Sequence, residues 1–354
     1  SSRAAANKFR PCGDGDSPAG KATMYAPGAT ITVVFQETVD HDGWYRIAFD
    51  MQRPFWVYGG LQDNGSWAGP SATPYSSGIL NEDWVRTNGG DGFFSVPEAD
   101  GREVYSNGQY LTLNRFNLQT REGRVIRPWN HPLGEAQKLG NWGAPKPLVG
   151  EFTYPANWDA PLIMSPHDSK TLYAGMRRLF RTRDRGETWE DLGDLTTGVD
   201  RRTLRIMGRL PDEKTLSLDD GVPYYATITA LAESPLRQGW LYVGTDDGNV
   251  QISTDGGAHF RNVASRITGL PASSWIAGIE ASRHKPGVLY LVADNHRNGD
   301  DANHLFKSAD NGETWTSIAG DLPPNRSLHT VREDPKNPNL LYLGSEFGLF
   351  LSFD

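Results

Sequence analysis

The stretch 234–260 reads SPLRQGWLYVGTDDGNVQISTDGGAHF and predicts two β-strands joined by a tight turn. A short apolar run begins at Trp240, an Asp-Asp-Gly turn follows it, and a second run alternates apolar and polar residues up to Ile252. The stretch then closes on Ser253-Thr-Asp-Gly-Gly, with Phe260 three residues further on. An Asp side chain can accept hydrogen bonds from its own turn, and glycine supplies positive φ. We therefore expect the aromatic ring to fold back onto this hairpin.

This Ser-x-Asp-x-Gly-x-x-aromatic pattern is the Asp-box, and the chain repeats it. Other copies read TRDRGETW at 182–189 and SADNGETW at 308–315, and another begins at Ser352. A Leu-Tyr pair precedes each copy, at 172–173, 241–242, 289–290 and 341–342. We expect the aromatic rings of the three complete copies to be buried against their own hairpins. The residues to which we assign a structural role are Asp184, Gly186, Trp189, Asp255, Gly257, Phe260, Asp310, Gly312 and Trp315.

Repetition at a period of roughly 40–50 residues, with several strands per unit, predicts an all-β β-propeller. We count about six Asp-box-type blades, six or seven in all, at 44–90, 91–130, 159–192, 224–265, 274–319 and 326–354. The predicted domains are an N-terminal arm and strand at 1–43 and the propeller at 44–354. Because the last unit lacks a fourth strand, we expect the strand at 29–37 to pair with it and close the ring, or to form a small separate β module.

The composition and charge of the chain limit the kinds of partner that it is expected to bind. The chain has 354 residues and a net charge of −8, which argues against nucleic acid and anionic membranes. It contains no run of apolar residues long enough to span a bilayer. Its single cysteine, Cys12, excludes an intrachain disulfide. The oligomeric state does not follow from the sequence.

Residues 51–354 resemble bacterial sortilin-type propeller proteins. The resemblance rests on QRPFWVYGGLQDNGSWAGPS at 52–71, GGDGFF at 89–94, SPHD at 165–168, YVGTDDG at 242–248 and LLYLGSEFG at 340–348. It implies a multi-bladed propeller that is secreted, either periplasmic or extracellular. Such proteins are often labelled glycosyl hydrolase-like on the strength of their Asp-boxes alone.

Residues 9–50 resemble the start of secreted lytic polysaccharide monooxygenase-like proteins, through Pro11-Cys12-Gly13 and His41. Those enzymes bind copper through an N-terminal His, whereas position 1 here is Ser, so we expect no copper and no other cofactor. His284, His296, His304 and His329 show no recognised zinc-ligand spacing. We interpret them as solvated loop residues and expect no metal site.

Acidic residues recur just after the second strand of several blades, where a propeller carries its binding face. Their placement resembles that of the catalytic aspartate in Asp-box xyloglucanases. Inverting hydrolysis needs two carboxylates ~6.5–9.5 Å apart, which spacing along the chain cannot show. As candidate catalytic residues we take Asp63, Asp246 and Asp247. As candidate ligand-binding residues we take Asp91, Asp294 and Glu346, together with Trp129, Trp142 and Trp158. Turn capping is the competing interpretation for each aspartate.

Two classes of function remain. The favoured one is a secreted propeller that presents an acidic channel face to a protein, peptide or glycan, because Asp-boxes describe folding rather than catalysis. The alternative is a glycoside hydrolase of the Asp-box xyloglucanase type that acts on a β-glucan through paired carboxylates. A test for reducing sugars released from a polysaccharide panel separates the two.

Overall fold

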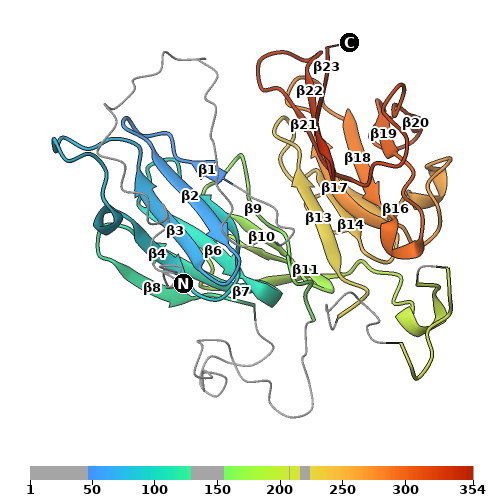
Figure 1. The fold of residues 1–354 in the computed structure, drawn as a ribbon, viewed down its shortest axis with the longest axis horizontal. Coiled ribbons are helices and arrows are strands. Elements are labelled where there is room, and N and C mark those ends of the chain that lie inside the picture. The colour runs from blue at the N-terminus through green and yellow to red at the C-terminus, as the bar shows by residue number, and fades with distance from the viewer. Residues whose placement is uncertain (1–46, 129–154, 207, 216–223, 354) are drawn as a thin grey trace, which may run out of the picture. The chain divides into compact units, whose positions relative to one another are not determined.

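The computed structural model describes residues 47–128, 155–206, 208–215 and 224–353, and in them it is all-β. These residues contain six antiparallel sheets, five of four strands and one of three, each formed by strands consecutive in the sequence (Figure 1). This is the strand content of a six-bladed β-propeller. Each of the six sheets matches one predicted repeat unit, with only the last strand of the unit at 159–192 running two residues further, to Asp194, so the predicted fold class is confirmed. The strand at 29–37 lies outside the described residues.

The described residues form two compact units: 47–127 make up the first, and 128 with 155–353 make up the second. The first unit holds two sheets. Sheet 1 contains β1 (Ile47–Phe49), β2 (Trp56–Leu61), β3 (Gly65–Pro70) and β4 (Val85–Asn88). Sheet 2 contains β5 (Gly92–Pro97), β6 (Glu103–Gly108), β7 (Thr112–Asn117) and β8 (Glu122–Val125).

The second unit holds the other four sheets. Sheet 3 contains β9 (Leu162–Met164), β10 (Leu172–Gly175), β11 (Arg178–Thr182) and β12 (Glu190–Asp194). Sheet 4 contains β13 (Ile228–Glu233), β14 (Leu241–Thr245), β15 (Val250–Ser253) and β16 (Arg261–Asn262). Sheet 5 contains β17 (Trp275–Ala281), β18 (Leu289–Asp294), β19 (His304–Ser308) and β20 (Thr316–Ser317). Sheet 6 contains β21 (Leu328–Glu333), β22 (Leu341–Ser345) and β23 (Gly348–Ser352).

Short 3₁₀ turns connect some of these strands, at Asn81–Asp83, Gln109–Leu111, Arg201–Thr203, Ala264–Arg266 and His296–Asn298. In the described residues no helix is long and apolar enough to cross a membrane.

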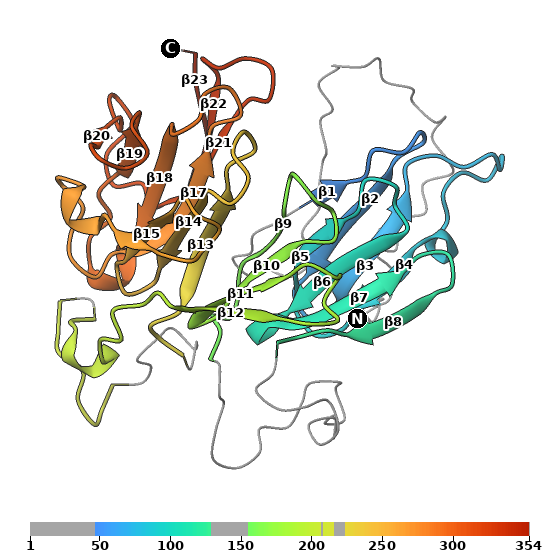
Figure 2. The same cartoon turned by 180° about the vertical axis from the view of Figure 1, so that it is seen from behind.

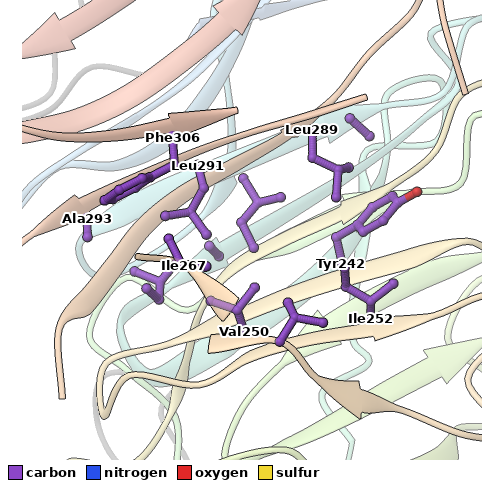
Figure 3. Packing of buried hydrophobic residues seen from close by; sticks show 13 residues of the cluster. Tyr242, Val250, Ile252, Ile267, Leu289, Leu291, Ala293 and Phe306 are labelled. Carbon is purple, nitrogen blue, oxygen red and sulfur yellow. The ribbon is translucent and has the colours of Figure 1, made fainter. Parts of the chain in front are cut away.

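Apolar side chains fill the spaces between successive sheets of a unit. Between sheets 4 and 5, Tyr242, Val250 and Ile252 face Leu289 and Leu291, and all five are buried (Figure 3). Similar clusters lie between sheets 3 and 4, between sheets 5 and 6, and between sheets 1 and 2. The first strands of sheets 4, 5 and 6, namely β13, β17 and β21, lie side by side (Figure 2). This is the way in which propeller blades pack, face to face with their first strands innermost.

The repeated tyrosine of the second strand has a recurrent use. Its ring is packed in the sheet, and its hydroxyl donates to a polar side chain at a turn, because a buried hydroxyl needs a partner. The acceptor belongs to the same sheet for Tyr58, Tyr105 and Tyr342, and to the next sheet for Tyr173, Tyr242 and Tyr290. The pairs are Tyr58–Asp50 (2.8 Å), Tyr105–Glu98 (2.8 Å), Tyr342–Asp334 (3.1 Å), Tyr173–Glu233 (3.4 Å), Tyr242–Asn311 (2.9 Å) and Tyr290–Glu333 (3.4 Å).

Candidate functional site

The Asp-box turns are held by a fixed set of hydrogen bonds. Ser308 Oγ donates to Asp310 Oδ1 (2.9 Å) and accepts from the backbone N–H of Gly312 (2.8 Å). Asp310 also accepts from the backbone N–H and the hydroxyl of Thr314, at 2.9 and 2.6 Å. Gly312 has φ +81°, which favours glycine. The copies at 182–189 and 253–260 repeat these contacts, with the His259 ring in place of the threonine hydroxyl. The carboxylates are thus engaged within their own turns.

The aromatic residues of the boxes are less buried than expected. Trp189, Phe260 and Trp315 are all half-buried. Phe260 packs against the apolar cluster between sheets 3 and 4, and Trp315 against the cluster between sheets 4 and 5. The rings were expected to be buried against their own hairpins, but they are only half-buried, and two of them pack on clusters shared with a neighbouring sheet.

Asp246, a candidate catalytic residue, is buried at the end of β14. Its Oδ1 accepts from the backbone N–H of Thr227 (2.7 Å), and its Oδ2 accepts from the hydroxyl of Thr227 (2.7 Å) and the Asn157 amide (3.4 Å). Its own N–H donates to the backbone oxygen of Thr227. These contacts join β14 to the segment before β13, which favours a structural role for this carboxylate.

Asp247, the neighbouring candidate, is also buried and anchors a long connection. Its Oδ2 accepts from the backbone and hydroxyl of Thr197, at 2.8 and 2.6 Å, and from the backbone N–H of Gly198 at 3.0 Å. Its Oδ1 accepts from the hydroxyl of Thr245 (2.6 Å), which in turn accepts from the N–H of Asn249. The turn therefore reproduces the Asp-box bonding pattern at the start of β15, whereas the Asp-box itself follows the end of that strand. This again favours a structural role for Asp247.

Asp63 and Asp91 meet in the first unit. Asp63 is exposed in the β2–β3 turn with φ +62°, and its N–H donates to Asp91 Oδ1 at 2.7 Å. Asp91 is buried, and its own N–H donates to Gln109 Oε1 (2.8 Å). Asp91 thus caps the turn that presents Asp63. The suggested pairing of Asp63 with Asp246 or Asp247 stays a prediction, since these residues belong to different units.

Asp294 and Glu346, two of the candidate binding residues, are joined through His329. Asp294 ends β18 and is almost fully buried, whereas Glu346 is exposed in the β22–β23 turn. His329 Nδ1 lies 3.3 Å from Asp294 Oδ2, and His329 Nε2 lies 2.9 Å from Glu346 Oε2. His296 Nδ1 lies 2.6 Å from the other oxygen of Asp294. We call these four residues the Asp-His network.

The buried carboxylate of Asp294 is stabilised by its neighbours in the Asp-His network. Burial alone would raise the pKa of Asp294, but hydrogen bonds from His296 and His329 outweigh it and hold that pKa well below its usual range. Arg297 adds a guanidinium nitrogen 3.9 Å from Asp294 Oδ2. Asp294 is therefore a carboxylate at neutral pH, and it fixes the imidazole of His329 that holds Glu346.

A pocket of about 410 Å³ opens beside this network. Its walls come from the loop after β18, the segment before β21 and the β22–β23 turn. The lining residues are His296, Asp301, Asn325, Ser327, Glu346 and Phe347. Phe347 leaves 69% of its surface exposed. Oxygen and nitrogen atoms therefore lie next to an accessible aromatic ring, an arrangement that can bind a polar molecule with an apolar face.

The expected tryptophan contacts divide by region. Trp129 and Trp142 lie outside the described residues, and Trp158 is half-buried beside Asn157. The four histidines were expected to be solvated loop residues, and for His329 and His304 this was wrong, because both are largely buried. His304 Nε2 lies 2.7 Å from Asp300 Oδ2, and His284 Nε2 lies 2.8 Å from the backbone oxygen of Asp334. In the described ranges no group of three or more His, Cys, Asp or Glu side chains could hold a metal ion.

Sequence reasoning missed several residues of this pocket. Asp301 and Asn325 belong to connections without a motif. Phe347 lies in the LLYLGSEFG stretch and His296 among the histidines weighed for zinc, but neither was assigned to a binding site. His329 offered no clear signal either, since its strand reads LHTVRE and most of its residues are polar.

No protein-family model matches the chain, and no curated protein matches it. Among solved structures, a GH74 enzyme of Niastella koreensis is similar at 16% identity and a TM-score of 0.44, over 72% of this chain and 33% of that one. A GH74 xyloglucanase from Xanthomonas campestris is similar at 18% identity and a TM-score of 0.44, over 72% of this chain and 34% of that one. The computationally designed Ika8 protein is similar at 12% identity and a TM-score of 0.47, over 86% and 70%.

The chain thus spans about a third of the length of the two GH74 enzymes. At these identities and TM-scores, the similarities do not determine the function of this chain, which must be argued from its own residues.

Proposed function

We propose that the chain binds glycans, with the pocket beside Glu346 and Phe347 as the binding site. The observation that carries this proposal is the combination of an exposed aromatic ring with several polar side chains in one pocket of about 410 Å³. That volume lies within the range of ~300–1,000 Å³ that is usual for small-molecule sites. A sugar ring has an apolar face that stacks on aromatic rings and hydroxyls that need donors and acceptors.

The lining side chains match this chemistry. Asn325 and Ser327 can both donate and accept, and Glu346 and Asp301 are strong acceptors for sugar hydroxyls. Glu346 is also held in place, because His329 contacts one of its oxygens. A glycan ligand agrees with the secreted location expected from the sequence resemblance.

Binding can be measured by isothermal titration calorimetry on a panel of neutral and acidic polysaccharides. The variant Phe347→Ala is expected to lower the affinity for the best ligand by about tenfold, the effect of removing a contact worth ~1.4 kcal/mol. Leu351→Ala is the matched control, since Leu351 is a half-exposed apolar residue of β23 that does not line the pocket. Equal losses in both variants, or binding of peptides but of no glycan, would count against the proposal.

A second candidate function is glycoside hydrolysis. Asp301 and Glu346 favour it, because two carboxylates line one pocket and hydrolysis by retention or inversion needs such a pair ~5–9.5 Å apart. Release of reducing ends from the ligand should then fall by orders of magnitude in Glu346→Gln and in Asp301→Asn, with binding retained. Asp63→Asn tests the pair suggested from the sequence. Full turnover in all three variants would eliminate hydrolysis through these residues.

A further inference from the structure

Arg326 lies beside this pocket without being one of its lining residues, and the described residues form no ion pair with it. It lies between Asn325 and Ser327, which both line the pocket. Its guanidinium carbon is 5.0 Å from the centroid of the Phe347 ring, so the group rests on that ring. Its Nε atom is buried and has no hydrogen-bond partner, and across the described part of the chain it forms no ion pair.

A buried donor on a charged group is costly when it has no acceptor. Arg261 and Arg297 of the second unit also have a buried nitrogen without a hydrogen-bond partner, but a carboxylate oxygen lies 2.9 Å from Arg261 and 3.9 Å from Arg297. Arg326 differs in that no carboxylate of the described residues forms an ion pair with its guanidinium. Its Nε is shielded, so the two Nη atoms are the donors that a ligand can reach. Such a fork fits a carboxylate, which can accept two parallel hydrogen bonds from it.

The acidic residues around the pocket leave room for an anion beside Arg326. Glu346 contacts His329, and Asp294 contacts His296 and His329, so each of these carboxylates already has an imidazole partner. Asp301 is exposed, and no residue in the described ranges forms an ion pair with it. An anionic ligand group is therefore repelled from Asp301 and attracted to Arg326, and this difference would orient an acidic ligand in the pocket.

We propose that the pocket takes an acidic glycan, one with a uronic acid unit whose carboxylate accepts hydrogen bonds from the Arg326 guanidinium. The proposal rests on the proposed glycan-binding function and adds the class of sugar. The uronic acid ring lies against the free side of the pocket next to Phe347, and its hydroxyls face Asn325, Ser327 and Glu346.

The test compares galacturonan, glucuronoxylan and alginate oligosaccharides with their carboxyl-reduced forms, which have the same linkages and no charge. Calorimetry at low ionic strength is expected to show at least one acidic oligosaccharide binding about tenfold more tightly than its reduced form, the strength of a charge-assisted pair. Arg326→Met should abolish that difference and leave the reduced form unaffected. Arg326→Lys should recover part of it. Asp301→Asn should strengthen binding of the acidic form.

The thermal unfolding curve of each variant shows whether it is folded, and Arg326→Lys keeps the test open if Arg326→Met is not. If glycans bind but the acidic and reduced forms bind equally, or if the preference survives Arg326→Met, the acidic-glycan proposal is overturned and glycan binding stands. If neither form nor any neutral glycan of the panel binds, both proposals fail.

Discussion

The guanidinium of Arg181 donates from Nη1 to the backbone oxygen of Gly256 at 2.6 Å, so a side chain of β11 grips the Asp-box turn of the next sheet. The same group also bonds Glu190 on its own sheet. Arg261 repeats the arrangement one sheet further on, where it donates to the backbone oxygen of Asn311. These contacts make the Asp-box part of the connection between neighbouring sheets.

Arg181→Met should therefore lower the free energy of unfolding by about 2 kcal/mol, because it removes a buried charge-assisted hydrogen bond and leaves the Gly256 oxygen without that donor. Urea unfolding followed by tryptophan fluorescence measures the change. Arg202→Met serves as the control, since Arg202 pairs with Asp200 in solvent and its loss should leave the free energy of unfolding nearly unchanged. Equal costs in both variants would contradict the role given to Arg181.

Asp247→Ala should destabilise the protein by about 3 kcal/mol or more, because it leaves three donors from Thr197 and Gly198 without their acceptor. The connection that follows Leu195 should also become easier to cleave by proteases. Limited proteolysis with mass spectrometry locates the cleavage, and thermal unfolding gives the stability. A folded variant of wild-type stability would reopen a catalytic role for Asp247.

The Asp-box predicts a loss of stability in acid. Hydrogen bonds from the side chain and backbone of Thr314 lower the pKa of Asp310 to about 2. Because the folded-state pKa is below the unfolded value of ~3.9, this carboxylate stabilises the protein above pH ~4 and ceases to do so as the pH falls toward 2. In Asp310→Asn, the decline in the urea midpoint between pH 4 and pH 2 should be shallower. An unchanged slope would show that the box carboxylate does not contribute.

His329→Phe should cost about 3 kcal/mol, because the buried Asp294 carboxylate loses one of its partners. The double variant His329→Phe with Asp294→Asn should recover part of this loss, since the remaining charge is then removed as well. Urea unfolding of the four proteins in this cycle measures the coupling. Additive effects of the two changes would mean that His329 and Asp294 do not stabilise one another.

The fold was predictable because its information is local. Each sheet follows a single stretch of sequence, and in sheets 3, 4 and 5 the Leu-Tyr pair marks the second strand and the Asp-box marks the turn after the third. The pair Leu241-Tyr242 and the box at 253–260 alone define most of sheet 4. The turn role of Asp247 was likewise weighed from the sequence, since Asp next to Gly is a turn signal.

The site was not predictable in the same way. His329, Asp294 and Glu346 come from β21, the end of β18 and the β22–β23 turn, and only the packing of sheet 5 on sheet 6 brings them together. Asp294 and Asp247 occupy similar positions after a second strand, yet one faces histidines and the other a loop backbone. The neighbouring segment decides what each carboxylate does, and that neighbour is remote in the sequence.

The hydroxyl of Tyr173, the guanidinium of Arg181 and the imidazole of His284 all bond to the sheet that follows theirs. From sheet 3 to sheet 6, a sheet thus offers donors to the one that follows it and acceptors to the one before it, which gives these junctions a repeated form. A duplicated blade would bring both halves of every junction with it, so copy number can change without redesign of an interface. A blade moved to another position needs to match its new neighbours at the residues that bond between sheets: the tyrosine, the arginine and the carbonyls of the box turn.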